Sequence, residues 1–203
     1  MNMGLAKLKT KVSIAEYIVG EETSQVRYEY LHGDVYQMAG SSQSHGRISA
    51  NLFGQLFAGL KGSQCEAYFE NTKVRPSESV FYYPDILVTC EGEFQNTFIA
   101  DAPVLLIEVT SPSTERIDRL EKLPACKSMP SVREIVIVNQ GRFAIEVYRR
   151  DSNDEWTTDF FDNPEDVFHL SSINMDISVA DVYDRVVFDA LRQLHPAETD
   201  YKN

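Results

Sequence analysis

The sequence predicts an α/β domain with buried central strands, and three segments carry that prediction. Residues 44–60 place apolar side chains at helical spacing, whereas residues 104–110 and 133–139 are nearly continuous apolar runs of strand length. Such runs are typical of strands that are buried on both faces of a sheet. Because the chain has 203 residues and is 43% hydrophobic, we expect one domain over residues 1–203, with a core at about 13–185.

The segment before the long helix predicts a short helix and a pair of extended segments. Ser13 and Glu16 form a capping-box pattern, which indicates a helix that begins at Ser13 and runs to about residue 18. Residues 28–31 fit either a helical turn or the start of a strand, and a His-Gly-Asp turn signal follows them. Residues 35–39 then alternate as a strand does.

After the long helix, the chain alternates between strand patterns and one short helix. Strands are expected at residues 66–71, 72–75 and 85–89, and a helix is expected at residues 114–122. Pro124 follows this helix directly. Because a proline in a helix interior costs about 3 kcal/mol, we expect the helix to end or kink just before it.

The C-terminal third is expected to add a hairpin and a final helix. Residues 143–149 alternate as the second arm of a hairpin, and residues 151–164 form a charged hairpin or loop. Residues 179–194 favour a helix. No stretch is long enough to serve as an interdomain linker, and no internal repeat is found.

The net charge of −12 argues at first against a nucleic-acid partner, since phosphate binding favours a basic surface. The charge is uneven, however. Residues 151–203 carry 13 acidic and 3 basic residues, whereas residues 1–150 carry 18 acidic and 16 basic residues. A DNA substrate is therefore not excluded for the first 150 residues.

The cysteines and the apolar runs bear on location. Cys65, Cys90 and Cys126 are odd in number and show no metal-binding spacing, so we expect free thiols in a reducing compartment. No apolar run approaches the roughly 20 residues of a membrane span. These observations predict a cytoplasmic protein that does not bind membranes.

Two carboxylates stand out as candidate metal ligands. Asp85 follows a proline at the start of a strand, and Glu108 lies near the end of the buried run at 104–110. A lone buried carboxylate needs a partner. Mg²⁺ or Mn²⁺ would suit two such oxygens, and the backbone carbonyl of Val109 could add a third. The alternative is structural, with Asp85 in a turn and Glu108 paired with an arginine.

Several segments together carry a resemblance to a known family. They are residues 28–35 (YEYLHGDV), 45–48 (HGRI), 84–86 (PDI), 107–114 (IEVTSPST), 118–122 (DRLEK) and 130–134 (PSVRE). Through them the sequence resembles the PD-(D/E)XK nuclease superfamily and, within it, the Uma family of predicted restriction endonucleases. The resemblance implies a restriction-endonuclease-like fold, which is a central mixed β-sheet flanked by helices. It also implies a Mg²⁺-dependent enzyme that hydrolyses the phosphodiester bonds of double-stranded DNA.

The resemblance assigns roles to individual residues. Asp85 and Glu108 match the two metal-binding acids of the superfamily. Thr110 stands where most members have a lysine, and in the Uma family Lys122 of the following helix would replace that lysine. Glu29 resembles an additional catalytic acid near the start of the core, which would bind the same metal ion or a second one. The alternatives are that Lys122 is solvated and pairs within its own helix, and that Glu29 is an ordinary surface residue.

Substrate contacts and assembly are expected as well. His45 opens the long helix, where unpaired N–H groups favour a phosphate, although it could also be a capping or packing residue. Arg116 and Arg119 would extend the DNA-binding face. Cutting both strands with one site per chain suits a homodimer. The alternative to an enzyme is a catalytically degraded member of the fold that serves as a dimeric binding module.

Overall fold

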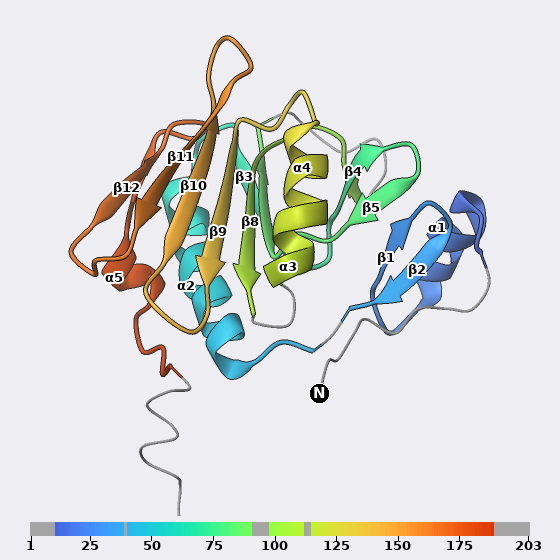
Figure 1. The fold of residues 1–203 in the computed structure, drawn as a ribbon, viewed down its shortest axis with the longest axis horizontal. Coiled ribbons are helices and arrows are strands. Elements are labelled where there is room, and N and C mark those ends of the chain that lie inside the picture. The colour runs from blue at the N-terminus through green and yellow to red at the C-terminus, as the bar shows by residue number, and fades with distance from the viewer. Residues whose placement is uncertain (1–10, 39, 91–97, 112–114, 189–203) are drawn as a thin grey trace, which may run out of the picture.

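The computed structural model describes residues 11–38, 40–90, 98–111 and 115–188 (Figure 1). The helices are α1 (Ile14–Thr23), α2 (Gln43–Gly59), α3 (Glu115–Ile117), the π-helical turn η1 (Asp118–Lys122), α4 (Leu123–Lys127) and α5 (Val179–Val182). The strands are β1 (Tyr28–Leu31), β2 (Asp34–Gln37), β3 (Glu66–Phe69), β4 (Lys73–Ser77), β5 (Val80–Tyr82), β6 (Ile86–Thr89), β7 (Ile99–Ala100), β8 (Pro103–Thr110), β9 (Glu134–Asn139), β10 (Ile145–Arg150), β11 (Trp156–Phe161), β12 (Val167–Leu170) and β13 (Met175–Ser178).

The strands form a mixed central sheet with a second sheet beside it. The central sheet has the order β11-β10-β9-β8-β6-β3, in which β8 and β9 are parallel and the other neighbours are antiparallel. The second sheet has the order β2-β1-β5-β4-β7, and β12 and β13 pair with each other. Helices flank the central sheet (Figure 1), so the predicted fold class is confirmed.

The side chains of β8 alternate between two cores, and this alternation positions the site. Leu105, Ile107 and Val109 pack in the core that contains α2, where Leu52 is fully buried. Leu106 packs in the other core, against residues of α4 and β9. Because a fully buried leucine contributes about 1.5–3 kcal/mol, these contacts hold β8 firmly between its covering helices.

In the N-terminal segment the predicted capping box is confirmed, and residues 28–31, for which a helical turn or a strand was expected, form a strand. Ser13 caps α1 through the expected reciprocal bonds with Glu16, although the helix runs beyond the predicted residue 18. Residues 28–31 form a strand, which pairs with β2. The turn between them has positive φ at His32 (51°) and Gly33 (90°), as a two-residue hairpin turn with type I′ twist requires.

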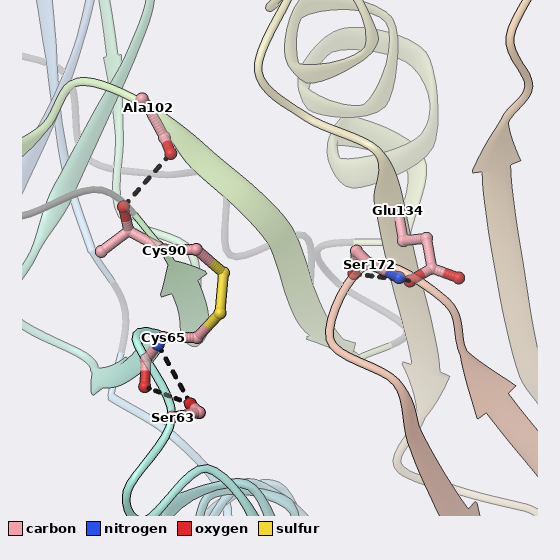
Figure 2. Close-up of a disulfide and its surroundings, with 7 residues drawn as sticks. Ser63, Cys65, Cys90, Ala102, Glu134 and Ser172 are labelled. Carbon is pink, nitrogen blue, oxygen red and sulfur yellow. Dashed lines mark hydrogen bonds between the residues drawn. A yellow bond between two sulfur atoms is a disulfide. The ribbon is translucent and has the colours of Figure 1, made fainter.

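The expectation of three free thiols is wrong, because Cys65 and Cys90 form a disulfide (Figure 2). Glu66 and Thr89 are paired at the ends of β3 and β6, so the next residues outward also face each other. A separation of 25 residues gave no spacing signal in the sequence. Cys126 stays a free, buried thiol. The thiol-based argument for a reducing compartment therefore does not hold.

The expectation that the helix ends before Pro124 is wrong, and the irregularity that the structure shows there is the π-helical turn η1. The helix continues from α3 through η1 to Lys127, with Pro124 in the first turn of α4. Leu123 donates to the carbonyl of Asp118, five residues earlier, so the helix widens by one residue just before the proline. A proline is tolerated at the start of a helical segment, because its missing N–H is not needed there.

The C-terminal third forms the expected hairpin but not the expected long helix. Residues 151–164 were expected to form a hairpin or a loop, and the hairpin is correct because β11 pairs with β10. Helix α5 has four residues, and residues 183–188 are turns and coil, whereas residues 189–194 of the predicted helix lie outside the described part of the chain. Buried Glu134 of β9 accepts hydrogen bonds from the backbone and hydroxyl of Ser172, which ties the β12–β13 hairpin to the central sheet (Figure 2).

No helix in the described ranges is long and apolar enough to cross a membrane. Residue 39 of the predicted strand and residue 114 of the predicted short helix lie outside those ranges. The strands predicted at 66–71, 72–75, 85–89, 104–110 and 133–139 correspond to β3, β4, β6, β8 and β9.

Candidate active site

Strand register brings the two candidate metal ligands together. Strands β6 and β8 are antiparallel, with Ile86 opposite Ile107. The preceding residue, Asp85, therefore lies opposite Glu108. Because side chains alternate along a strand, Glu108 shares the face of Leu106, which is covered by the helix that carries Lys122.

Asp85 is fixed by two contacts on one carboxylate oxygen. The Val109 N–H donates to Asp85 Oδ2 at 2.7 Å, and His45 Nε2 lies 3.2 Å from the same oxygen. Neither contact occupies Oδ1. The carboxylate thus has a fixed orientation and keeps one oxygen available for a further ligand.

His45 is the third residue of α2 and faces Asp85. Ser42 caps the helix by accepting from the His45 N–H. Burial lowers the pKa of His45, but the hydrogen bond and the charge of Asp85, with smaller contributions from Glu70 and Asp118, raise the pKa by more. Its Nδ1 is buried and has no hydrogen-bond partner among the described residues. The phosphate contact expected for His45 stays a prediction, since its imidazole is used to orient Asp85.

Lys122 lies among three carboxylates. Its Nζ is 2.7 Å from Glu29 Oε1, 3.6 Å from Asp118 Oδ1 and 4.0 Å from Glu108 Oε1. Burial lowers the pKa of Lys122, but the three carboxylates together raise it well above the usual value. The lysine side chain is 12% exposed, so the alternative in which Lys122 is solvated is wrong. The ion pair with Asp118 that this alternative included is present.

The site carries more negative charge than it can neutralise itself. Burial raises the pKa of Glu108 well above its usual value, and the neighbouring Asp85, Asp118 and Glu29 raise it further, whereas Lys122 opposes the rise. Three carboxylates thus lie within 4.0 Å of one lysine, and the fourth, Asp85, faces His45. Asp118 was missed as a member of this cluster, and its position four residues before Lys122 was the signal that could have found it.

These residues line one cleft with a volume of about 630 Å³. The predicted residues in its lining are Glu29, His45, Asp85, Glu108, Val109 and Lys122. Sequence reasoning missed Gln25, Arg27, Gln37, Glu70, Asn71 and Asp118 in this lining, to which Gln140 also belongs. The cleft therefore brings together every predicted catalytic and metal-binding residue.

The two predicted DNA-binding arginines do not line the cleft. Arg119 donates to both carboxylate oxygens of Glu146 at 2.6 and 2.5 Å, and its Nε donates to Glu115 at 3.2 Å. Arg116 is exposed on α3 and makes no ion pair with any residue in the described ranges. The role of both arginines in DNA binding stays a prediction.

The donors at the site suit a hard divalent cation. Within the described residues, no three His, Cys, Asp or Glu side chains converge as a ready-made metal-binding group. Binding of Mg²⁺ or Mn²⁺ by Asp85, Glu108 and the carbonyl of Val109 stays a prediction. Mg²⁺ commonly binds through one or two carboxylates and keeps several waters, so two carboxylates with surplus negative charge fit it.

Comparison with known proteins places the chain in a family. Residues 14–180 match the family model Uma2, described as "Putative restriction endonuclease". The chain belongs to the Uma2 family. The Synechocystis sp. protein slr1290 is 29% identical over 180 residues, which cover 88% of this chain and 94% of that protein. A second Synechocystis protein, sll1609, is 28% identical over 152 residues, which cover 72% of this chain and 86% of that protein.

A solved structure shares the fold of this Uma2 chain. It is the crystal structure of a "putative nuclease belonging to DUF820" from Anabaena variabilis, with a TM-score of 0.70 and 17% sequence identity. The match covers 87% of this chain and 99% of the other. At this identity the likeness supports the restriction-endonuclease-like fold, and the chemistry has to be argued from the residues of the cleft.

Proposed function

We propose that this protein is a Mg²⁺-dependent endonuclease that hydrolyses phosphodiester bonds of double-stranded DNA. The observation that carries the proposal is the convergence of Asp85, Glu108, Lys122 and Glu29 in one cleft. Glu29 lies in β1, Asp85 directly before β6, Glu108 in β8 and Lys122 in η1. Membership of the Uma2 family supports the same conclusion.

In this proposal Asp85 and Glu108 hold the metal ion with the carbonyl of Val109. When bound, such an ion would lower the pKa of a water and neutralise charge on the scissile phosphate. The contacts of Asp85 with His45 and with the Val109 N–H keep its carboxylate aimed at this position. The raised pKa of Glu108 reflects its burial first and the neighbouring carboxylates second, and a bound cation would favour the charged form against both.

Lys122 is the group that would act on the reacting phosphate. Its contacts with Glu29 and Asp118 keep the ammonium protonated and point it at the carboxylate of Glu108. A protonated lysine beside the metal site would stabilise negative charge that develops on the phosphate. Glu29 and Asp118 are positioning residues in this account, because they act through Lys122.

The test is metal-dependent cleavage of supercoiled plasmid by Asp85→Asn and Glu108→Gln. We expect each substitution to reduce cleavage by more than about a hundredfold, because the metal contributes several kcal/mol to such reactions. Calorimetry should show weaker Mn²⁺ binding in both variants. The matched control is Asp162→Asn, which removes an exposed carboxylate outside the cleft. Unchanged Mn²⁺ affinity in both site variants would contradict the assignment.

The acidic character of the chain favours a second candidate function. The chain has a net charge of −12, which disfavours DNA binding. The second candidate is a protein whose site is catalytically degraded and which serves only as a dimeric binding module, so it would need no affinity for DNA. This alternative predicts no cleavage with Mg²⁺ or Mn²⁺ at any salt concentration. It also predicts no DNA binding by the wild-type protein in Ca²⁺ at low salt.

We also propose a homodimer, since one site per chain cuts one strand at a time and a two-fold pair of sites would cut both. Sedimentation equilibrium of the full chain measures this directly. If the protein is a monomer at all concentrations that support cleavage, the homodimer proposal is wrong. The expected activity would then be nicking of one strand of the duplex.

A further inference from the structure

The described lining of the cleft contains one lysine, Lys122, and one arginine, Arg27. Lys122 has three carboxylates within 4.0 Å of its Nζ. Its charge is therefore already shared inside the protein. A DNA backbone in this cleft carries several phosphates, so the state of the second cation decides whether any positive charge is left for them.

Arg27 is held by neutral oxygens. Its Nε donates to Asn71 Oδ1 at 3.0 Å, and its Nη1 donates to the carbonyl of Ser24 at 3.4 Å. It makes no ion pair with any carboxylate in the described part of the chain. These contacts fix the plane of the guanidinium without neutralising it. They use Nε and one N–H of Nη1, so the guanidinium keeps the two donors that bidentate binding of a phosphate needs.

The backbone places Arg27 on the same side of its strand as Glu29. The N–H of Met38 donates to the carbonyl of Arg27, which extends the β1–β2 ladder one residue beyond Tyr28. Residues two apart on a strand share a face. Tyr30 on the opposite face packs against α1, whereas Glu29 reaches Lys122. Arg27 therefore lies about 7 Å along the chain from the residue that contacts the catalytic lysine.

We propose that Arg27 binds a non-scissile phosphate of the DNA strand, beside the phosphate at Asp85 and Glu108. Asn71, in the turn between β3 and β4, is a positioning residue that holds the guanidinium toward the cleft. The inference rests on the proposed nuclease function and adds a substrate contact to it. It moves the main phosphate contact from the helix that carries Arg119, which is bound to Glu146, to the start of β1.

The test is binding of a fluorescent duplex by anisotropy, in Ca²⁺ and at several salt concentrations, with Arg27→Gln and Arg133→Gln. Arg133 is a matched control, because it is exposed, has no ion pair with a described residue, and precedes β9 at the end of the sheet away from Glu108. We expect Arg27→Gln to bind roughly tenfold more weakly. The slope of log affinity against log salt should fall by about 0.9, as loss of one phosphate contact predicts. Arg133→Gln should match the wild type.

A second variant separates orientation from charge. Asn71→Ala keeps the charge of Arg27 but frees its guanidinium, so we expect several-fold weaker binding with an unchanged salt slope. Thermal unfolding and Mn²⁺ calorimetry of each variant check that the fold and the metal site remain intact. If Arg27→Gln does not fold, the affinity of Asn71→Ala decides the question.

The possible failures are distinguishable. Wild-type affinity and salt slope in a folded Arg27→Gln variant would overturn the inference about Arg27 while the nuclease proposal stands. The same holds if Arg133→Gln weakens binding as much as Arg27→Gln does. A wild-type protein that neither binds nor cuts DNA would overturn both proposals together.

Discussion

At the scale of single residues, Lys122 shows how a cluster of carboxylates sets the state of a buried group. Burial by itself favours the neutral amine, yet three carboxylates within 4.0 Å keep the ammonium form. The same lysine lowers the cost of burying Glu108. Each residue of the cluster therefore depends on the others, and substitutions in it should not be additive.

Replacing Lys122 should separate catalysis from metal binding. In Lys122→Met the lysine no longer stabilises charge on the phosphate, so plasmid cleavage should fall by about a hundredfold or more. Mn²⁺ affinity should stay the same or rise, because Glu29, Glu108 and Asp118 lose their cation. Lys61→Met, at an exposed position after α2, is the control. Cleavage by Lys122→Met at the wild-type rate would show that Lys122 has no catalytic role.

At the scale of elements, the helix from α3 to α4 is attached to the sheet through Arg119. The two terminal nitrogens of its guanidinium, Nη1 and Nη2, donate to Glu146 of β10, which also accepts from the hydroxyl of Tyr148. Arg119 belongs to the π-helical turn, which ends two residues before Pro124. Anchor and turn together hold Lys122 and Asp118 over the end of β8, so we infer that Arg119 supports the site from outside the cleft.

The Arg119–Glu146 pair should make stability depend on pH. Burial raises the pKa of Glu146, but hydrogen bonds from Arg119 and Tyr148 lower it by more, so the folded-state pKa lies below the unfolded value of about 4.5. The contribution is therefore fully present above pH 4.5 and is lost as pH falls through the folded-state pKa. Urea unfolding should show Glu146→Gln about 1–2 kcal/mol less stable at pH 7.

The same comparison at about pH 3.5, below the unfolded value, should show a smaller difference, because the unfolded chain then binds a proton at residue 146 more readily than the folded chain does. Glu165→Gln removes an exposed carboxylate and should match the wild type at both pH values. A difference that stays constant with pH would mean that packing, and not the ion pair, accounts for the loss.

At the scale of the whole molecule, the acidic C-terminal segment and the cleft lie apart. The acidic C-terminal third forms β11, β12, β13 and α5 at one end of the molecule, whereas β1 and β2 lie at the other (Figure 1). The described lining of the cleft runs from Gln25 to Gln140 and takes no residue from 151–188. The charge of residues 151–188 is therefore separate from the charge of the cleft, whose described lining holds five carboxylates, Arg27 and Lys122.

Neutralising acidic residues of this C-terminal third should change DNA binding only slightly. Asp181→Asn with Asp184→Asn removes two exposed charges of α5 and the following turn. We expect an unchanged salt slope and at most a small gain in affinity, because only the long-range field changes. Anisotropy with the same duplex measures both. A lost or much weaker interaction would mean that this end of the molecule contacts DNA.

The sequence predicted the features that depend on local patterns. The apolar runs at β8 and β9 and the spacing of α2 identified the core, and the carboxylate in a buried run identified Glu108. The disulfide depends on the pairing of β3 with β6, and the π-helical turn depends on how Pro124 is accommodated. Local patterns determine neither feature. Arg27 was missed because a single arginine before a short strand does not differ from an ordinary surface charge.

The disulfide has a consequence for the connectivity of the molecule. Between Cys65 and Cys90 the chain forms β3, crosses to β4 and β5 of the second sheet, and returns through Asp85 to β6. A protease that cut the exposed β4–β5 turn at Glu78 would therefore release no fragment. The nicked protein would run as one band on a gel without reductant and as two bands with it. Asp85 would stay covalently linked to both halves of the nuclease fold.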